Sequence, residues 1–271
     1  DLKLNILPEN PETLDDPRIV GPGRFPSWLH RKLPQGNDLW STGQILAENR
    51  LPTVCEEARC PNLLECWSKK TATFLIMGKE CTRACGFCDI DFSKTPKALE
   101  EDEPQRVADS VVKLNLKHVV ITMVARDDIP LQGANHIAAV VDAVRAASPT
   151  CTIELLTSDF NGDLDALDTV LGAKPDIFNH NIETVRALSP RVRHKATYDR
   201  TLEMLKAAHE RRHTPELIIK SGIMVGLGES AAQVEESLRD LAAAGCDIVT
   251  IGQYLQPNRN KLLVKSFVHP D

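Results

Sequence analysis

The sequence predicts an α/β fold built on a parallel sheet, as an open (β/α)6 partial barrel. From residue 73 onward, six short apolar runs alternate with longer segments, most of which carry apolar residues at helical spacing. The 271 residues are 42% hydrophobic, which is enough to bury one large core. Six units are two short of a closed eightfold barrel, and a doubly wound sheet is the alternative.

The elements can be assigned in chain order. Residues 1–72 hold eight of the 17 prolines and lack sustained periodicity, so we expect an irregular N-terminal extension with one short helix near residues 38–49. Residues 73–271 form the predicted barrel core. Its strands are expected at residues 73–77, 118–123, 152–156, 176–179, 217–225 and 247–252, and its helices at residues 104–115, 134–147, 197–211 and 230–244. A functional site should lie at the carboxyl ends of these strands.

Charge and hydropathy limit the partners. The 38 acidic and 32 basic residues give a net charge of -6, which indicates a small molecule or a protein as partner and no nucleic acid. No uncharged apolar run approaches the roughly 18 residues that cross a bilayer, and no signal peptide begins the chain. We therefore expect no membrane partner and a cytoplasmic location. An organelle stroma or matrix stays open, because the chain starts at Asp1 and a transit peptide could have been removed.

Six of the eight cysteines lie between residues 55 and 88. Disulfides are the simple explanation, but they mostly stabilise small secreted domains that lack a core, so metal or iron-sulfur binding is favoured. The other two, Cys151 and Cys246, stand alone and are expected to be small buried hydrophobes.

Cys81, Cys85 and Cys88 have the spacing C-x3-C-x2-C directly after the first expected strand. Three thiolates can bind three irons of a 4Fe-4S cluster and leave the fourth iron open, whereas structural zinc would need a fourth protein ligand. Spacing and position resemble the radical SAM superfamily. That resemblance implies that the open iron binds S-adenosylmethionine, and that an electron from the cluster cleaves it to a 5′-deoxyadenosyl radical.

Further residues match the superfamily pattern. Residues 222–229 resemble G-x-I-x-G-x-x-E, with Met224 at the Ile position. In this motif Gly222, Val225 and Gly226 would lie near the adenine; a strand ending in a glycine turn is the alternative. Phe87 matches the aromatic residue beside the adenine, and Arg83 could offset the cluster's negative charge. The alternatives are a core aromatic residue and a solvated loop charge.

Cys55, Cys60 and Cys66 have the spacing C-x4-C-x5-C with no histidine nearby, which implies a second cluster. Residues 53–67 resemble the auxiliary-cluster motif of the lipoyl synthase family, and the agreement continues at residues 126–128, 154–160, 178–184, 221–228 and 252–257. This resemblance implies a sulfurtransferase that inserts two sulfurs into an octanoyl chain on a lysine of a lipoyl carrier domain. It implies two 4Fe-4S clusters, of which the auxiliary one is the sulfur donor, S-adenosylmethionine, and a reduced electron donor such as flavodoxin or ferredoxin.

The chain departs from the family in two places. Where relatives carry Ser-Val-Asp, residues 123–125 are Met-Val-Ala. The resemblance also implies a C-terminal Arg-Ser-Ser-Tyr motif, one serine of which is the fourth auxiliary-cluster ligand, and residues 1–271 contain no such motif. We therefore expect a C-terminal tail to be missing.

Polar residues at strand ends are candidate cofactor ligands. Glu154 alternates with apolar neighbours, so it is either an interior ribose ligand or a solvated edge charge. Asn179, Asn181 and Glu183 could hold the ribose and methionine ends of the cofactor, or form an Asx turn before a helix. The family motifs add Thr122, Arg126 and Gln253, with Asp127 beside Arg126.

Other residues have less specific signals. Arg191, Arg193, His194 and Lys195 form a basic cluster that is either a solvated face or a contact for the cofactor carboxylate or an acidic carrier domain. His180 is either a packing histidine or a proton donor.

Two other functions compete with this prediction. One is another radical SAM sulfur inserter, such as a methylthiotransferase for RNA or a relative of biotin synthase; the compact upstream triplet argues against both, and the acidic charge against RNA. The second is a non-catalytic zinc or iron-sulfur module that only binds a partner.

Overall fold

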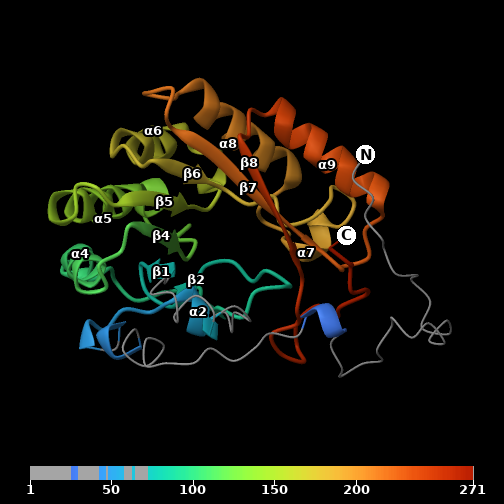
Figure 1. The fold of residues 1–271 in the computed structure, drawn as a ribbon, viewed down its shortest axis with the longest axis horizontal. Coiled ribbons are helices and arrows are strands. Elements are labelled where there is room, and N and C mark those ends of the chain that lie inside the picture. The colour runs from blue at the N-terminus through green and yellow to red at the C-terminus, as the bar shows by residue number, and fades with distance from the viewer. Residues whose placement is uncertain (1–25, 30–42, 47, 58–62, 65–72, 271) are drawn as a thin grey trace.

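The structure is a computed structural model that describes residues 26–29, 43–46, 48–57, 63–64 and 73–270 (Figure 1). Its body is a six-stranded sheet in the order β1-β4-β5-β6-β7-β8, and every neighbouring pair is parallel. The strands are β1 (Thr73–Ile76), β4 (His118–Met123), β5 (Thr152–Leu156), β6 (Ile177–Asn179), β7 (Ile218–Val225) and β8 (Ile248–Gln253). Because this order never reverses, the sheet is the predicted partial barrel and not the doubly wound alternative.

Helices cover one side of this sheet, in an arc that Figure 1 shows from α4 to α9. The long ones are α4 (Glu103–Lys113), α5 (Ala134–Ala147), α6 (Leu164–Gly172), α8 (Tyr198–Glu210) and α9 (Ala231–Ala243). Short elements are η2 (Ser27–Leu29), α2 (Val54–Glu57), η3 (Pro130–Gly133), η4 (Phe160–Gly162) and α7 (Ser189–Val192), with a two-stranded parallel sheet of β2 (Glu80–Cys81) and β3 (Asp91–Phe92).

Local sequence signals set the helix ends. Ser230 caps α9 through a capping box with Gln233, and Thr197 caps α8 by accepting the amide of Arg200. Asp163 caps α6, a helix that the sequence prediction omitted. Its nine residues are too few for a sustained periodic pattern, although its buried residues Ala166, Leu167, Val170 and Leu171 do recur at helical spacing.

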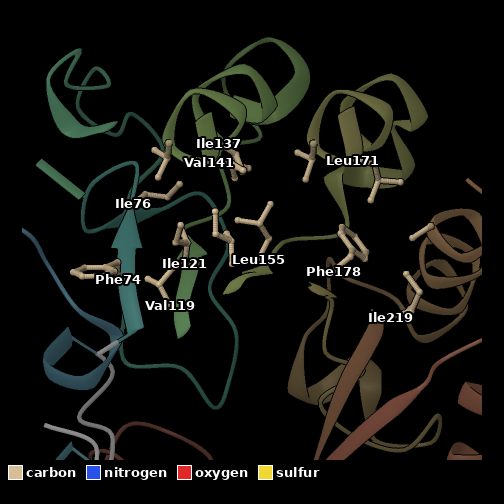
Figure 2. Packing of buried hydrophobic residues seen from close by; sticks show 14 of the residues in the cluster. Phe74, Ile76, Val119, Ile121, Ile137, Val141, Leu155, Leu171, Phe178 and Ile219 are labelled. Atoms are coloured by element: carbon tan, nitrogen blue, oxygen red, sulfur yellow. The ribbon is translucent and has the colours of Figure 1, made fainter. Parts of the chain in front are cut away.

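The core lies between the sheet and the helices. Phe74, Ile121, Leu155, Phe178 and Ile219 occupy matching positions on successive strands, and all five are at most 1% exposed (Figure 2). Side chains alternate along a strand, so the residues between these positions face the inner side of the partial barrel. Polar residues of the strands, including Thr122, Glu154, Asn179 and Lys220, occupy that inner side by the same alternation.

Predicted and observed boundaries agree within two residues at every long element that was predicted, and β4, β5 and α5 match fully. Within the expected helix at 38–49, residues 43–46 and 48 are helical, and the others except 49 lie outside the described residues. The extension adjoins β1, where the amide of Leu75 donates to the carbonyl of Pro52 at 3.0 Å. Its boundary at residue 72 stays a prediction. None of the described helices is long and apolar enough to cross a bilayer.

Candidate functional site

The cysteine loop, residues 81–88, lies just beyond the carboxyl end of β1. It leaves β2 at Cys81, and the chain returns at β3, which pairs in parallel with β2. Cys81, Cys85 and Cys88 are all free thiols of intermediate burial. The first predicted triplet therefore sits at the expected edge of the sheet.

Backbone hydrogen bonds fix the middle of this loop. The amide of Gly86 donates to the carbonyl of Val192 at 2.8 Å, and the amide of Leu262 donates to the carbonyl of Gly86 at 3.0 Å. A Cβ atom on Gly86 would lie 3.1 Å from the Leu262 side chain and 3.2 Å from the carbonyl of Arg191. The loop is thus held between α7 and a segment near the C-terminus.

The thiols of the loop are suited to bind a cationic centre. Burial and the neighbouring thiols raise the pKa of Cys85 to about 12, and burial is the main cause that raises the pKa of Cys88 to about 11. As thiolates they would need metal charge for compensation. Within the described part of the chain, no three Cys, His, Asp or Glu side chains gather closely enough for one metal ion. The three thiols of this loop suit a multi-iron cluster, in which each thiolate binds a different iron.

Arg83 is buried in a network of carboxylates. It donates to Asp127 from both Nε and Nη2, at 2.9 and 2.7 Å to the nearest oxygens, and from Nη1 to Asp159 at 2.5 Å. Thr82 joins the same network, because its hydroxyl donates to Asp127 at 3.0 Å. The solvated-charge alternative for Arg83 is wrong, since the residue is 5% exposed. Its charge is compensated within the protein.

Phe87 packs against a small apolar cluster of Val192, Leu227 and Tyr254 and is only partly buried. That contact fits the core-aromatic alternative and leaves part of the ring exposed. A contact with the adenine stays a prediction.

Thr122 and Arg126 at the end of β4 are both buried and both have protein partners. The hydroxyl of Thr122 donates to the carbonyl of Leu156 at 2.9 Å. Arg126 forms a bidentate pair with Asp128, with both distances 2.8 Å, while its Nη1 atom has no partner among the described residues. Among the described residues, Arg126 Nη1 has no protein partner and could therefore contact a ligand.

Glu154 lies on the inner side of the partial barrel, 3% exposed, so the solvated-edge alternative is wrong. Its carboxylate accepts from Asn179 at 2.7 Å and Lys220 at 2.8 Å, and His118 lies 3.3 Å away. Burial opposes the ionisation of Glu154, but the combined effect of these donors is larger and lowers the pKa of Glu154 to about 2. A ribose contact stays a prediction.

Asn179, Asn181 and Glu183 follow along one chain segment after β6. Asn179 Oδ1 is buried without a partner in the described chain, and the Asn181 side chain covers Gly222, where a Cβ atom would lie 2.7 Å from Asn181 Oδ1. Glu183 has a positive φ of 64° and pairs with β7, because its amide donates to the carbonyl of Gly222 at 2.9 Å. Burial raises the pKa of Glu183.

The glycine turn after β7 holds a C-terminal segment of the chain. Gly226 has φ 98°, and a Cβ atom there would lie 2.2 Å from Nε2 of Gln253. Gln253 donates to the carbonyl of Ser266 at 3.0 Å and accepts from the amide of Val268 at 2.8 Å. Val225, the last residue of β7, is buried, and its carbonyl accepts from the amide of Tyr254 at 2.8 Å. Cofactor contacts at these positions stay predictions.

His180 is a packing histidine. Both ring nitrogens have partners, the carbonyl of Thr157 at 2.8 Å and the hydroxyl of Thr201 at 3.2 Å, and burial lowers the pKa of His180 to about 4. The basic cluster divides into two parts: Arg193 is buried, whereas Arg191, His194 and Lys195 are exposed.

Two site residues escaped the sequence analysis, Lys220 and Asp159. A lone lysine in the apolar run of β7 was a usable signal, because a charge in a covered strand needs a buried partner. Asp159 lies in a matched motif, but its bond to Arg83 spans 76 residues and no local pattern reveals it.

The second triplet is only partly described. Cys55 belongs to the backbone of α2, close to β1, whereas Cys60 and Cys66 lie outside the described residues. The structure therefore leaves the ligands of the second cluster untested.

Comparison with known proteins identifies the family. Residues 75–252 match the Radical SAM superfamily. Among solved structures, methylornithine synthase has a TM-score of 0.55 at 17% identity, covering 71% of this chain and 58% of that one. The hydrogenase maturase HydG from Carboxydothermus hydrogenoformans has 0.56 at 13% identity, covering 85% and 59%. At such identities these two show the fold alone.

Full-length relatives are far more similar. A lipoyl synthase of Protochlamydia amoebophila is 66% identical, with 99% of this chain and 83% of the relative covered. A lipoyl synthase of Chlamydia muridarum is 50% identical, with 98% and 85% covered. On this identity over nearly the whole chain, and with a three-cysteine loop at the carboxyl edge of a partial barrel, the protein belongs to the lipoyl synthases of the radical SAM superfamily.

Proposed function

We propose that Cys81, Cys85 and Cys88 hold the 4Fe-4S cluster at which S-adenosylmethionine is cleaved. The observation that carries this proposal is that three free, half-buried thiols share one anchored loop at the carboxyl edge of the sheet. When bound, the cluster would supply the electron that converts the cofactor to a radical able to remove hydrogen from saturated carbon.

The inner side of the partial barrel would bind the cofactor beside this loop. Asn179 offers a buried carbonyl oxygen that has no partner in the described part of the chain, which suits a hydroxyl or ammonium donor. The side-chain amide of Asn179 donates a hydrogen bond to Glu154 at 2.7 Å, which orients this oxygen. Asn181 and Glu183 lie beside Gly222 within β7, where a Cβ atom would lie 2.7 Å from Asn181 Oδ1 and 2.9 Å from Thr250 Oγ1. A buried oxygen without a partner among the described residues, next to this close approach, supports cofactor binding here.

We further assign Cys55, Cys60 and Cys66 to a second 4Fe-4S cluster that donates sulfur. The spacing of the motif supports this, as does the position of α2: Thr53, just before it, bridges to Phe74 of β1. Glu57 at the end of α2 forms an ion pair with Lys79, which follows β1 just before the cysteine loop, so α2 lies near the first triplet.

The proposed substrate is an octanoyl chain on a lysine of a lipoyl carrier domain, and a reduced flavodoxin or ferredoxin would supply electrons. Two saturated carbons each exchange one hydrogen for sulfur, so each carbon needs one radical. A polar nucleophile cannot attack such carbons, which supports the use of radical chemistry at this site.

The test is anaerobic reconstitution with iron and sulfide, followed by incubation with S-adenosylmethionine, dithionite and an octanoyl-lysine peptide. We expect about eight irons per chain for two 4Fe-4S clusters, and a peptide mass increased by two sulfurs as the dithiol, or by two sulfurs less two hydrogens after oxidation to the disulfide. Zinc in place of iron, or a cluster-loaded chain that leaves the peptide unchanged, would overturn the proposal and favour a non-catalytic binding module.

A further inference from the structure

Arg193 is a buried cation that has no ion-pair partner among the described residues. It follows α7 and is 4% exposed. Nη1 donates to the carbonyl of Asn181 at 2.7 Å, and Nη2 donates to the hydroxyl of Thr201. Its Nε atom is buried with no partner in the described chain. These acceptors are neutral, so they orient the guanidinium without compensating its charge.

An uncompensated charge in the interior is costly, and buried charges are normally paired. The titratable groups close enough to act on the charge of Arg193 include Glu183, Asp159, Cys85, Arg83 and His180. Asp159 already binds Arg83 at 2.5 Å and Arg200 at 3.2 Å. Glu183 lies nearby without forming an ion pair with Arg193. Burial raises the pKa of Glu183 and so disfavours its ionised form, whereas Cys85 would bring an anion to this position as a metal-bound thiolate.

The backbone also brings Arg193 to the cysteine loop. Val192 accepts the amide of Gly86 at 2.8 Å, so the residue before Arg193 contacts the residue after Cys85. A thiolate-bound iron-sulfur cluster is an anion and becomes more negative when it takes up an electron. A fixed positive charge in a desolvated place beside it makes that uptake easier.

We propose that Arg193 is the cation that compensates the cluster held by the cysteine loop, and that it raises the reduction potential of that cluster. Arg83 was predicted to compensate the charge of the cluster, but its own charge is already balanced by Asp127 and Asp159. The inference rests on the proposed assignment of Cys81, Cys85 and Cys88 as cluster ligands.

The test is a redox titration of the reconstituted chain without S-adenosylmethionine, followed by electron paramagnetic resonance. The titration is done in the full chain and in a triple variant with Cys55, Cys60 and Cys66 changed to Ala. In the triple variant only the cluster of the cysteine loop contributes to the signal. Arg193→Gln, which keeps donors and loses the charge, should shift the midpoint potential to more negative values. Arg193→Lys should retain most of the wild-type potential.

Two controls separate charge from packing. Arg191→Met removes an exposed cation two residues away, which water already screens, so the potential should not move. Thr201→Val removes a hydrogen-bond acceptor and leaves the charge, so its potential should stay close to wild type.

The outcomes are distinct. If the wild-type chain binds no cluster at this loop, the proposed function fails, and the inference with it. If Arg193→Gln binds the cluster with an unchanged potential, only the inference is wrong, and weaker binding of S-adenosylmethionine would then assign the charge to the cofactor carboxylate. If Arg193→Lys assembles a cluster and Arg193→Gln does not, the difference in assembly itself supports the need for a positive charge at this position. If Arg193→Lys and Arg193→Gln are equally impaired, the proposal is wrong.

Discussion

At the scale of single residues, the site depends on where buried charges find partners. Arg83 brings the cysteine loop into contact with Asp127 after β4 and Asp159 after β5, three segments that meet at one edge of the sheet. Both pairs are nearly excluded from water, so each contributes only while both partners remain. The network therefore ties the position of the thiols to the rest of the sheet.

Asp127→Asn should destabilise the protein through this network. Breaking a buried ion pair leaves Arg83 short of charge compensation, and such losses cost about 3 kcal/mol. The exposed pair of Asp199 with Arg186 is the matched control, for which Asp199→Asn should cost less than about 1 kcal/mol. Urea unfolding of the cluster-free chain measures both. Equal losses in the two variants would contradict the structural role of the network.

His180 predicts a pH dependence of stability. Its pKa is about 4 in the fold and about 6.5 in an unfolded chain, so the unfolded chain binds the proton first as the pH falls. Its contribution is fully present above about pH 6.5 and is lost as the pH falls toward 4. Between pH 7 and 5 the loss should be about 2 kcal/mol. Urea unfolding of the cluster-free chain should show this slope, and His180→Asn should remove it; an unchanged slope would contradict the assignment.

At the scale of elements, residues 262–268, which follow β8, hold the cysteine loop and the turn after β7 in place through backbone hydrogen bonds. The amide of Leu262 binds the carbonyl of Gly86, and the amide of Lys265 binds the carbonyl of Gly226 at 2.8 Å. The hydroxyl of Tyr254 donates to the carbonyl of Leu262 at 2.8 Å. The cysteine loop and the turn after β7 are thus held by one stretch of chain.

Gly226→Ala tests this fastening. Alanine at φ 98° is strained, and its Cβ atom would meet Gln253 at 2.2 Å and the carbonyl of Ser266 at 2.5 Å. We expect a loss of more than about 1 kcal/mol and faster amide hydrogen exchange over residues 262–268. Gly172→Ala at the end of α6, where no atom lies within 4 Å of the new Cβ, should be neutral or slightly stabilising. Unchanged exchange in Gly226→Ala would show that the turn does not hold the segment.

The predictability of the elements follows from how local their signals are. Continuous apolar runs and periodic helices were assigned correctly because their burial pattern depends on residues that are close in sequence, as in β4 and α5. α6 was omitted because nine residues give little periodicity. The small sheet of β2 and β3 has two residues in each strand, too few for any pattern.

At the scale of the whole molecule, the sequence predicted where the cysteine loop lies but not which side chains contact it. The spacing of Cys81, Cys85 and Cys88 after a strand predicted the cysteine loop and its place at the sheet edge. The charge that compensates the cluster was predicted for Arg83 and is proposed for Arg193. The difference depends on loops brought together by folding, so residue type alone could not reveal it. For the same reason, Gln253 was predicted to bind the cofactor, whereas its described contacts are to the C-terminal segment.

The central claim is that the two cysteine triplets have different tasks, and one measurement on paired variants tests it most directly. Reconstituted Cys85→Ala and Cys60→Ala chains are incubated with S-adenosylmethionine, reductant and octanoyl-lysine peptide, and 5′-deoxyadenosine and peptide sulfur are quantified together. We predict that Cys85→Ala forms neither product, whereas Cys60→Ala forms 5′-deoxyadenosine and no lipoyl peptide. A Cys60→Ala chain that inserts sulfur, or a Cys85→Ala chain that still cleaves the cofactor, would contradict the account.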